Sequence, residues 1–217
     1  GQTTVPMVVR CSVGAGKGYG GQQSQSLESL FSHLPGLIVA YPSTAEDAKG
    51  MLKSANRSDD PVLFCASQGL DAARGPVPEG EYTVPLGKSA VVREGGDATI
   101  VAWGPAVPDA LKAAEELAAE GVECDVIDLR TLVPLDMEPV LASVAKTGRC
   151  VVAAQAVLSG SYVNEVVARV VNEAFDDLDA PVARIGAANG ISPQAEGLEA
   201  AFLPGVADIT EAVKGLI

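Results

Sequence analysis

The chain has 217 residues, of which 47% are hydrophobic, so it can bury substantial cores and is not a disordered protein. It carries 28 acidic against 15 basic residues, which gives a net charge of −13. This charge repels nucleic-acid phosphates and anionic lipids, so we expect neither nucleic-acid nor membrane binding.

Residues 1–71 alternate between short apolar runs and helical patterns. The apolar runs predict strands at residues 5–10, 37–41 and 61–65. The patterns between them predict helices at residues 26–33 and 44–56. Residues 43–46 read Ser-Thr-Ala-Glu, a capping box that marks a helix start. Three parallel strands alone would make an odd domain, so we expect that the amino-terminal half of this domain is missing from the chain or separately encoded.

A proline- and glycine-rich stretch follows. Residues 72–86 hold three prolines and two glycines without a sustained period, which predicts an interdomain linker over 72–87. From 88 to 217, near-continuous apolar runs alternate with amphipathic helices. The strands are expected at 99–103, 124–129 and 149–154, and the helices at 108–120 and 163–175. The fold class is therefore predicted to be α/β, with two doubly wound parallel-sheet domains.

The four cysteines lie far apart in the sequence, without the close pairs that are typical of zinc sites. Most of them sit in apolar runs, where a reduced thiol behaves as a small hydrophobic group. The sequence contains no stretch of about 18 apolar residues that would indicate a membrane span. We therefore expect a cytoplasmic protein with reduced cysteines.

A glycine-rich loop at residues 14–21 joins the first predicted strand to the first predicted helix. It lacks the Gly-x-x-x-x-Gly-Lys-Ser/Thr spacing of a phosphate-binding loop. A flexible segment between a strand and a helix is where α/β proteins place chemistry, because backbone can approach a ligand there. An active-site loop is the favoured interpretation, and a plain surface connection is the alternative.

Several blocks along the chain resemble one known family. They are residues 22–31, 34–37, 41–44, 47–50, 84–88 and above all 121–136, which reads Gly-Val-Glu-Cys-Asp-Val-Ile-Asp-Leu-Arg-Thr-Leu-Val-Pro-Leu-Asp. On these blocks the whole chain resembles the β-type subunits of thiamine-diphosphate-dependent 2-oxoacid dehydrogenases. That family holds the pyruvate, acetoin and branched-chain enzymes of the transketolase-like superfamily. The resemblance implies that residues 1–71 are the later half of the pyrimidine-binding domain and that residues 88–217 are the transketolase-type carboxyl-terminal domain.

The resemblance also implies an activity. Such a heteromeric enzyme cleaves a keto donor and transfers the acyl or two-carbon unit to a lipoyl or carrier-protein thiol. Its cofactor is thiamine diphosphate with magnesium, shared between subunits: an α-type partner holds the diphosphate, and the β-type chain cups the aminopyrimidine. An α2β2 heterotetramer is expected. The activating glutamate of the family is expected in the missing amino-terminal part, so no cofactor-binding residue is assigned here.

Gln23 takes the position of a family histidine in a His-Ser-Gln motif. An amide donates and accepts hydrogen bonds but exchanges no proton near neutral pH, so acid–base work is lost there. On this resemblance we expect Gln23 to act at the catalytic site by holding a substrate oxygen through hydrogen bonding, and a relic polar residue without a role is the alternative. Other charged or proton-carrying family positions are neutral or changed here, at Ala66, Asp71, Ala154, Gln155 and Asn189.

These departures leave two alternatives open. One is transketolase-like ketol transfer from a sugar phosphate in a specialised biosynthetic pathway. The other is a non-catalytic scaffold subunit that completes an assembly. His33, the single histidine, matches a second family position, and its expected role is to close a short helix.

Between a predicted helix and strand, residues 56–60 read Asn-Arg-Ser-Asp-Asp and match the family's monovalent-cation loop. The resemblance places potassium ligands at backbone carbonyls and side-chain groups of Ala55, Asn56, Ser58 and Asp60. Oxygen ligands suit such a hard cation. Because the family's aspartate and asparagine are Ser58 and Asp60 here, a solvated turn is the alternative.

Overall fold

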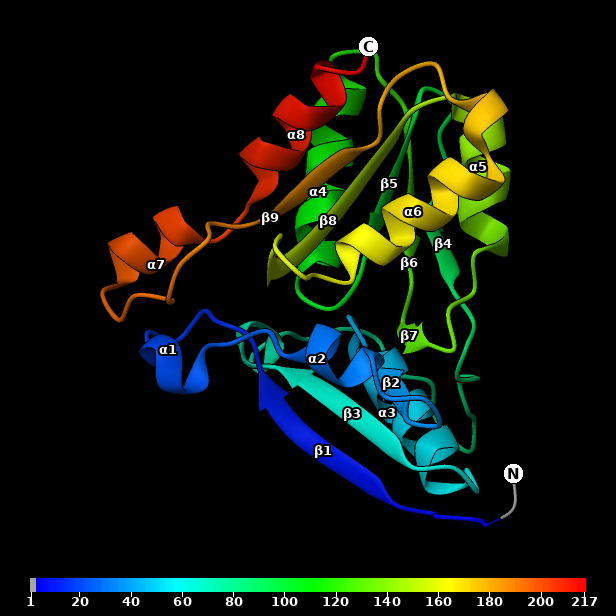
Figure 1. The fold of residues 1–217 in the computed structure, drawn as a ribbon, viewed down its shortest axis with the longest axis vertical. Helices are drawn as coiled ribbons and strands as arrows, with labels where there is room; N and C mark the ends of the chain where they lie inside the picture. The colour runs from blue at the N-terminus through cyan, green and yellow to red at the C-terminus, as the bar shows by residue number, and fades with distance from the viewer. Residues whose placement is uncertain (1–2) are drawn as a thin grey trace.

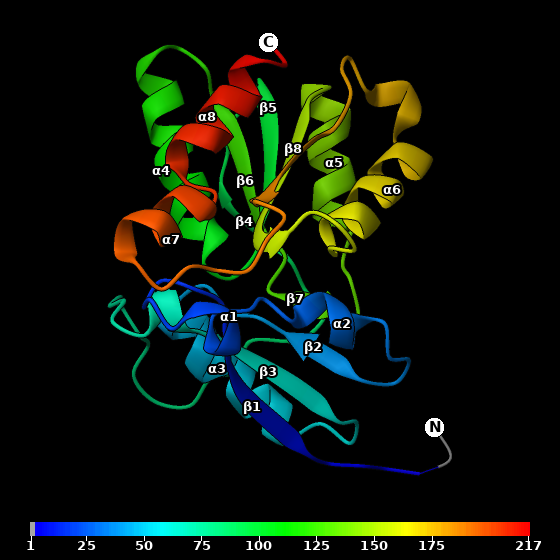
Figure 2. The same ribbon diagram turned by 60° about the vertical axis from the view of Figure 1, so that its left-hand side comes forward.

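A computed structural model describes residues 3–217 and shows two α/β units, one above the other, with the chain's first segment in the lower one (Figure 1). The described strands form two sheets. The α/β class is confirmed, with helices packed against both faces of the larger sheet (Figure 2).

The first sheet has the strand order β1-β3-β2-β7. The members are β1 (Val8–Val13), β3 (Val62–Ser67), β2 (Ile38–Ala40) and β7 (Thr131–Val133). The first three strands are parallel, and β7 is antiparallel to β2. Helix α3 (Ala45–Asn56) covers one face, where Met51 packs with Val62 and Phe64. The short helices α1 (Gly20–Gln23) and α2 (Glu28–Ser32) and the 3₁₀ turn η1 (Gln68–Leu70) lie in the connections.

The second sheet has the order β4-β6-β5-β8-β9. The members are β4 (Ala90–Arg93), β6 (Cys124–Asp128), β5 (Ala98–Ala102), β8 (Cys150–Val157) and β9 (Ala183–Ala187). All neighbours are parallel except β4 and β6. The remaining elements are α4 (Ala106–Ala119), α5 (Glu138–Thr147), α6 (Val163–Glu173), η2 (Phe175–Asp177), α7 (Glu196–Phe202) and α8 (Val206–Lys214).

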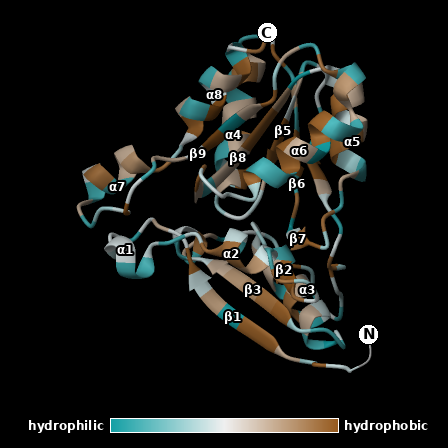
Figure 3. Ribbon diagram, in the orientation of Figure 1, coloured by the Kyte–Doolittle hydropathy of each residue, from teal (hydrophilic) through white to brown (hydrophobic). Residues whose placement is uncertain are grey.

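Alternate residues of the central strands feed two cores in the second sheet, because successive side chains of a strand point to opposite faces. Ile100 joins the cluster beneath α4 and α8, and its neighbour Val101 joins the cluster beneath α5 and α6. Burial on both faces explains why these strands read as continuous apolar runs, which Figure 3 shows as hydrophobic colour along the central strands.

Several expectations need correction. The first strand begins at Val8 rather than at residue 5, because it runs in register with β3 from Val8 opposite Val62. The helix cap is Thr44, whose hydroxyl accepts a hydrogen bond from the Asp47 backbone N–H at 3.0 Å, so the capping pattern lies one residue later than predicted. Ser43 is left free to contact the second sheet. The sheets are also not purely parallel, since β4 and β7 add antiparallel edges.

The stretch over 72–87 packs on the first sheet's helix rather than hanging free. Val84 is buried, and its carbonyl accepts a hydrogen bond from Ser54 Oγ at 2.6 Å. A Cβ on Gly50 would meet Val84 Cγ2 at 2.5 Å, so the close approach requires glycine. Among the described helices, none combines the length and apolar character that a membrane crossing would require.

Candidate functional site

The carboxyl ends of the two sheets face each other. Strands β1, β2 and β3 are parallel, so the glycine-rich loop, Tyr41 and η1 follow them at one edge. Residues at the ends of β5, β6 and β8 meet that edge, for example Trp103, which donates from Nε1 to Glu28 Oε1 at 3.4 Å. Ligands of α/β sheets bind at the carboxyl ends of strands, so this boundary is the candidate active site.

Hydrogen bonds fix the glycine-rich loop against the second domain. Gln155 Oε1, on β8, accepts from the Ala15 backbone N–H at 2.9 Å, and Glu199 Oε2 accepts from the Gly18 N–H at 3.0 Å. Gly18 has φ +66°, and a Cβ there would lie 2.7 Å from the Gln194 carbonyl oxygen. The glycines are therefore needed for positive φ and for close contact between the domains.

Gln23 is the last residue of α1, and its side chain is exposed. Its backbone carbonyl accepts a hydrogen bond from Gln68 Nε2 at 2.5 Å. Gln68 belongs to η1, directly after β3. The structure thus places an amide beside Gln23 that sequence reasoning missed; the available signal was its position just past a buried strand.

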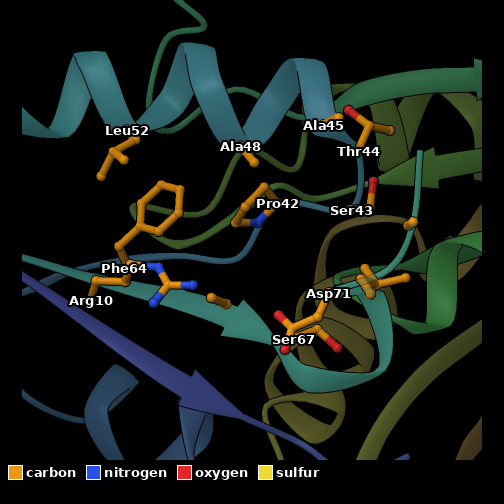
Figure 4. A pocket seen from close by; sticks show the side chains of 13 residues that line it. Arg10, Pro42, Ser43, Thr44, Ala45, Ala48, Leu52, Phe64, Ser67 and Asp71 are labelled. Carbon is orange, nitrogen blue, oxygen red and sulfur yellow. The ribbon is translucent and has the colours of Figure 1, made fainter. Parts of the chain in front are cut away.

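A cavity of about 270 Å³ lies between β3 and α3 (Figure 4). Its lining includes Arg10, Ser43, Ser67 and Asp71, and Figure 4 shows Phe64 between α3 and Arg10. Ala66 and Asp71, two of the departures from the family pattern, both line this cavity. Arg10 and Ser67 were not found from sequence, because neither stands in a motif.

Lys17, from the glycine-rich loop, is held in a surface ion pair. Its Nζ lies 2.6 Å from Asp71 Oδ2. A hydrogen bond to that carboxylate raises the pKa of Lys17. Because the cation already has a partner, the loop offers little free positive charge to an anionic ligand.

A buried polar network joins the two domains at the ends of β2 and β6. Ser43 Oγ donates to Asp128 Oδ2, and the Arg130 backbone N–H donates to Asp128 Oδ1 at 2.9 Å. The Arg130 guanidinium in turn lies 2.9 Å from Asp47 Oδ1. Burial raises the pKa of Asp128 to about 6, an effect that these hydrogen bonds only partly offset.

A second buried carboxyl is that of Glu28, the first residue of α2. Desolvation raises its pKa, and the Trp103 N–H opposes that effect. The hydroxyl of Tyr41 is buried nearby without a hydrogen-bond partner among the described residues, and desolvation raises its pKa well above the usual range. These groups are candidates for function that the sequence did not single out, because their proximity depends on the meeting of two sheets.

The predicted cation loop lies at the amino end of β3, the opposite end from Gln23. The Ala55 carbonyl accepts from the Ser58 N–H at 3.2 Å, and Ser58 Oγ accepts from the Asp60 N–H at 3.1 Å. Asn56 donates from Nδ2 to the Leu52 carbonyl at 2.9 Å. Across residues 3–217, no three or more His, Cys, Asp or Glu side chains gather as a metal-holding group.

His33 directly follows α2, as expected for a residue at a helix end. The cysteines are free thiols: Cys65, Cys124 and Cys150 are buried, and Cys11 is partly buried. Cys11 and Cys65 stand opposite each other on β1 and β3. A hydrogen bond involving the Cys65 thiol lowers the pKa of Cys11.

The chain matches two protein-family models and one solved structure of the transketolase type. Residues 87–209 match the family model described as "Transketolase, C-terminal domain", and residues 1–71 match "Transketolase, pyrimidine binding domain". A solved structure, "Split gene transketolase, inactive beta4 tetramer", aligns with a TM-score of 0.77 and 26% identity over 95% of this chain and 65% of that chain. The fold and the facing strand ends are thus those of a transketolase-type protein.

Curated relatives narrow the class further. The chain is 42% identical to "Acetoin:2,6-dichlorophenolindophenol oxidoreductase subunit beta" of Cupriavidus necator, over 99% of this chain and 63% of the relative. It is 41% and 40% identical to "Pyruvate dehydrogenase E1 component subunit beta" of Rhizobium meliloti and Bacillus subtilis, over all of this chain and 47% and 67% of those relatives.

The chain therefore belongs to the family of β subunits of pyruvate, acetoin and branched-chain 2-oxoacid dehydrogenases, as the sequence blocks indicated. It spans less than two thirds of the length of the first two relatives.

Proposed function

We propose that this chain is the β-type part of a thiamine-diphosphate-dependent enzyme that cleaves a keto donor. The acyl or two-carbon unit passes to a lipoyl or carrier-protein thiol. The observation that carries the proposal is the meeting of Gln23, Gln68 and the glycine-rich loop at the carboxyl edge of the first sheet, facing the second domain. The relatives named above support the same class of reaction.

In this proposal the chain divides into a pyrimidine-binding part (1–71), a linker (72–87) and a carboxyl-terminal domain (88–217). The ends of the two family-model matches support that division. The strand β7 crosses from the carboxyl-terminal part into the first sheet, so the two parts are tied together.

The residues at the site fit the aminopyrimidine better than the diphosphate. Ser67 Oγ, next to Gln68, is buried without a partner in the described chain, and amides and hydroxyls can pair with the edge of a polar heterocycle. A diphosphate needs cations, and Lys17 is already paired with Asp71. We therefore assign the diphosphate and magnesium to an α-type subunit in a cytoplasmic α2β2 assembly; when bound, the cofactor supplies the electron sink for cleavage.

Gln23 is assigned the role of holding a donor oxygen by hydrogen bonding. A direct test purifies the polypeptide with its companion subunit, measures bound thiamine diphosphate, and compares turnover of 2-oxoacids and ketose phosphates. Gln23→Ala should lower kcat/KM for the true donor by about tenfold, the effect of losing one good hydrogen bond. Unchanged kcat/KM in Gln23→Ala would refute the assignment.

Gln23→His separates the alternatives. Faster turnover of a plain 2-oxoacid in this variant would indicate a degraded ancestral site, whereas slower turnover of the native donor would indicate a retuned one. A complex that binds no thiamine diphosphate and turns over neither donor class would favour the scaffold.

The cation loop is proposed to bind potassium through carbonyl oxygens of Ala55 and Asn56 with Ser58 and Asp60. Potassium chloride should then raise the melting temperature relative to choline chloride at equal ionic strength, since a ligand that binds only the folded state stabilises it. Asp60→Asn should reduce the difference between the salts, and Asp59→Asn, on the neighbouring residue, should not. Equal melting temperatures in both salts would contradict the site.

A further inference from the structure

Cys11 and Cys65 are direct neighbours on two adjacent strands of the first sheet. In the parallel pairing of β1 with β3, Cys11 stands opposite Cys65. Both side chains join the same apolar cluster, whereas Phe64 joins the cluster beneath α3, so the two cysteines point to the face of the sheet away from α3. Strand register and side-chain direction therefore bring together two thiols that are far apart in the sequence.

The spacing of these strands suits a disulfide bond. Neighbouring strands lie about 4.8 Å apart, and the Cα atoms of disulfide-linked cysteines usually lie about 4.4–6.8 Å apart. A hydrogen bond between the two side chains shows that the sulfur atoms already face each other. Closing the bond draws the two Cβ atoms closer than the sheet spacing, and such strain makes a disulfide easier to reduce.

The two thiols differ in their access to solvent. Cys65 is fully buried, whereas Cys11 is partly buried and lines an apolar hollow of about 340 Å³. The lining of this hollow includes Leu27 and Leu34, which are 38% and 48% exposed, so the hollow is open to solvent. A small uncharged oxidant can therefore enter it and reach Cys11 before Cys65.

The two thiols also differ in reactivity. The hydrogen bond from the Cys65 thiol stabilises the Cys11 thiolate and lowers the pKa of Cys11 to about 7, while the same bond and burial raise the pKa of Cys65. The thiolate is the form that attacks a peroxide, so Cys11 is the first nucleophile at neutral pH. Cys65 is then the second thiol, adjacent to the oxidised sulfur and needing no contact with solvent.

We propose that Cys11 and Cys65 are a modification site for hydroperoxides, at which the two thiols form a reversible disulfide. The Cys11 thiolate attacks one peroxide oxygen, the O–O bond breaks, and the other oxygen leaves and takes up a proton, as water when the oxidant is hydrogen peroxide. The Cys65 sulfur then attacks the sulfenic sulfur of Cys11, and the hydroxyl group leaves with the Cys65 proton as water. The two electrons lost by the thiols reduce the peroxide.

The disulfide would act on the candidate site without touching it. The glycine-rich loop follows β1, and η1, which holds the Gln23 carbonyl through Gln68, follows β3. A covalent link between these two strands restrains the relative motion of the segments that follow them. Oxidation is therefore expected to reduce the mobility of the loop and of η1.

Peptide mapping tests the bond directly. The reduced polypeptide, purified with its companion, is treated with a small excess of hydrogen peroxide at pH 7, alkylated in denaturant and digested without reduction. We expect a peptide pair cross-linked through Cys11 and Cys65, which dithiothreitol separates, and alkylated Cys124 and Cys150. Cys11 that stays alkylated, or that is oxidised without a link to Cys65, would overturn the proposal.

Two variants assign the roles. Cys65→Ser keeps a hydroxyl that can donate to Cys11 but cannot close the bond, so dimedone, which traps sulfenic acids, should label Cys11 about tenfold more than in the original protein. Cys124→Ser is the matched control: β5 separates β6 from β8, so Cys124 and Cys150 are not on neighbouring strands, and the Cys11–Cys65 link should form as before. Equal dimedone labelling with and without the Cys65 thiol would refute its role as the second thiol.

Hydrogen–deuterium exchange tests the effect on the candidate site. Peptides that cover residues 14–23 and 68–70 should exchange more slowly in the oxidised original protein than in the reduced one, and the peroxide-treated Cys65→Ser variant should show no such slowing. Equal exchange in both forms of the original protein would refute the restraint. None of these measurements depends on turnover, so the inference stands or falls separately from the proposed function.

Discussion

Replacing Asp128 with Asn should remove part of the pH dependence of folding stability. The carboxyl is buried at the meeting of the two domains and hydrogen-bonded by Ser43 and Arg130. Burial raises its pKa from an ordinary 3.8 to about 6. Between these values the folded state holds a proton that the unfolded state has released, so the free energy of unfolding falls as pH rises.

The size of the change in stability follows from the difference between the two pKa values of Asp128, 3.8 and about 6. Each pH unit across which only the folded state is protonated changes the free energy of unfolding by about 1.4 kcal/mol, so the whole interval amounts to about 3 kcal/mol. Asn carries no such charge and can still accept from the Arg130 N–H. Relative to the original protein, the variant should therefore gain about 2.4 kcal/mol between pH 4 and pH 7, slightly less than the whole interval because pH 4 already lies above the ordinary pKa of 3.8.

Urea unfolding followed by circular dichroism, at half-unit steps from pH 4 to pH 7.5, measures this difference. Taking the difference between the two proteins cancels the other titrating groups of an acidic chain. Asp136→Asn, at a less buried carboxylate, is measured alongside as the matched control for removing an aspartate from this region. Parallel curves for Asp128→Asn and the original protein would refute the reasoning.

Two further predictions test the packing of the boundary and the thiols. Gly104→Ala should destabilise the fold by about 2–4 kcal/mol, because Gly104 has φ +53° and an added Cβ would lie 2.6 Å from the Tyr41 ring. The control Gly121→Ala, at φ +89° with open space around the added Cβ, should lose only about 1 kcal/mol; urea unfolding measures both. Equal losses of unfolding free energy in the two variants would show that the contact with the Tyr41 ring does not determine the cost at Gly104. Iodoacetamide at pH 7, read by peptide mass spectrometry, should label Cys11 before Cys124 and Cys150, because burial raises the pKa values of those thiols to about 11 and about 12. Cys65→Ala should slow the labelling of Cys11, and an unchanged rate would contradict the proposed hydrogen bond.

The central strands were predictable because their physics is local. Residues 150–154, which read Cys-Val-Val-Ala-Ala, are apolar on both faces, and only a strand buried on both sides needs that pattern. Helices α4 and α6 were found from their apolar stripes, and α3 from the capping pattern at its start, which are also local signals. The family resemblance came from short blocks whose order is itself distinctive.

The rest depends on contacts between distant segments. The strand β7 has three residues and is defined by its pairing with β2, so no local period reveals it. Gln68 and Ser67 become site candidates only once β1 and β3 are adjacent. Ser43 was predicted to cap a helix, but the meeting of the sheets gives it Asp128 as a partner. Because Ser43 pairs with Asp128, Thr44 rather than Ser43 caps the helix.

The crossing of β7 limits how this molecule can be divided or recombined. Arg130, the residue before β7, has φ +57°, and its carbonyl accepts the Tyr41 N–H at 2.7 Å. Splitting the gene within residues 72–87 would leave β2 as an exposed edge strand in one fragment and β7 without its pairing partner in the other. Exchange of the carboxyl-terminal half between homologues is thus restricted to donors whose 131–133 segment complements the recipient's β2. Substitutions in β2 and in residues 131–133 are therefore expected to change together in evolution.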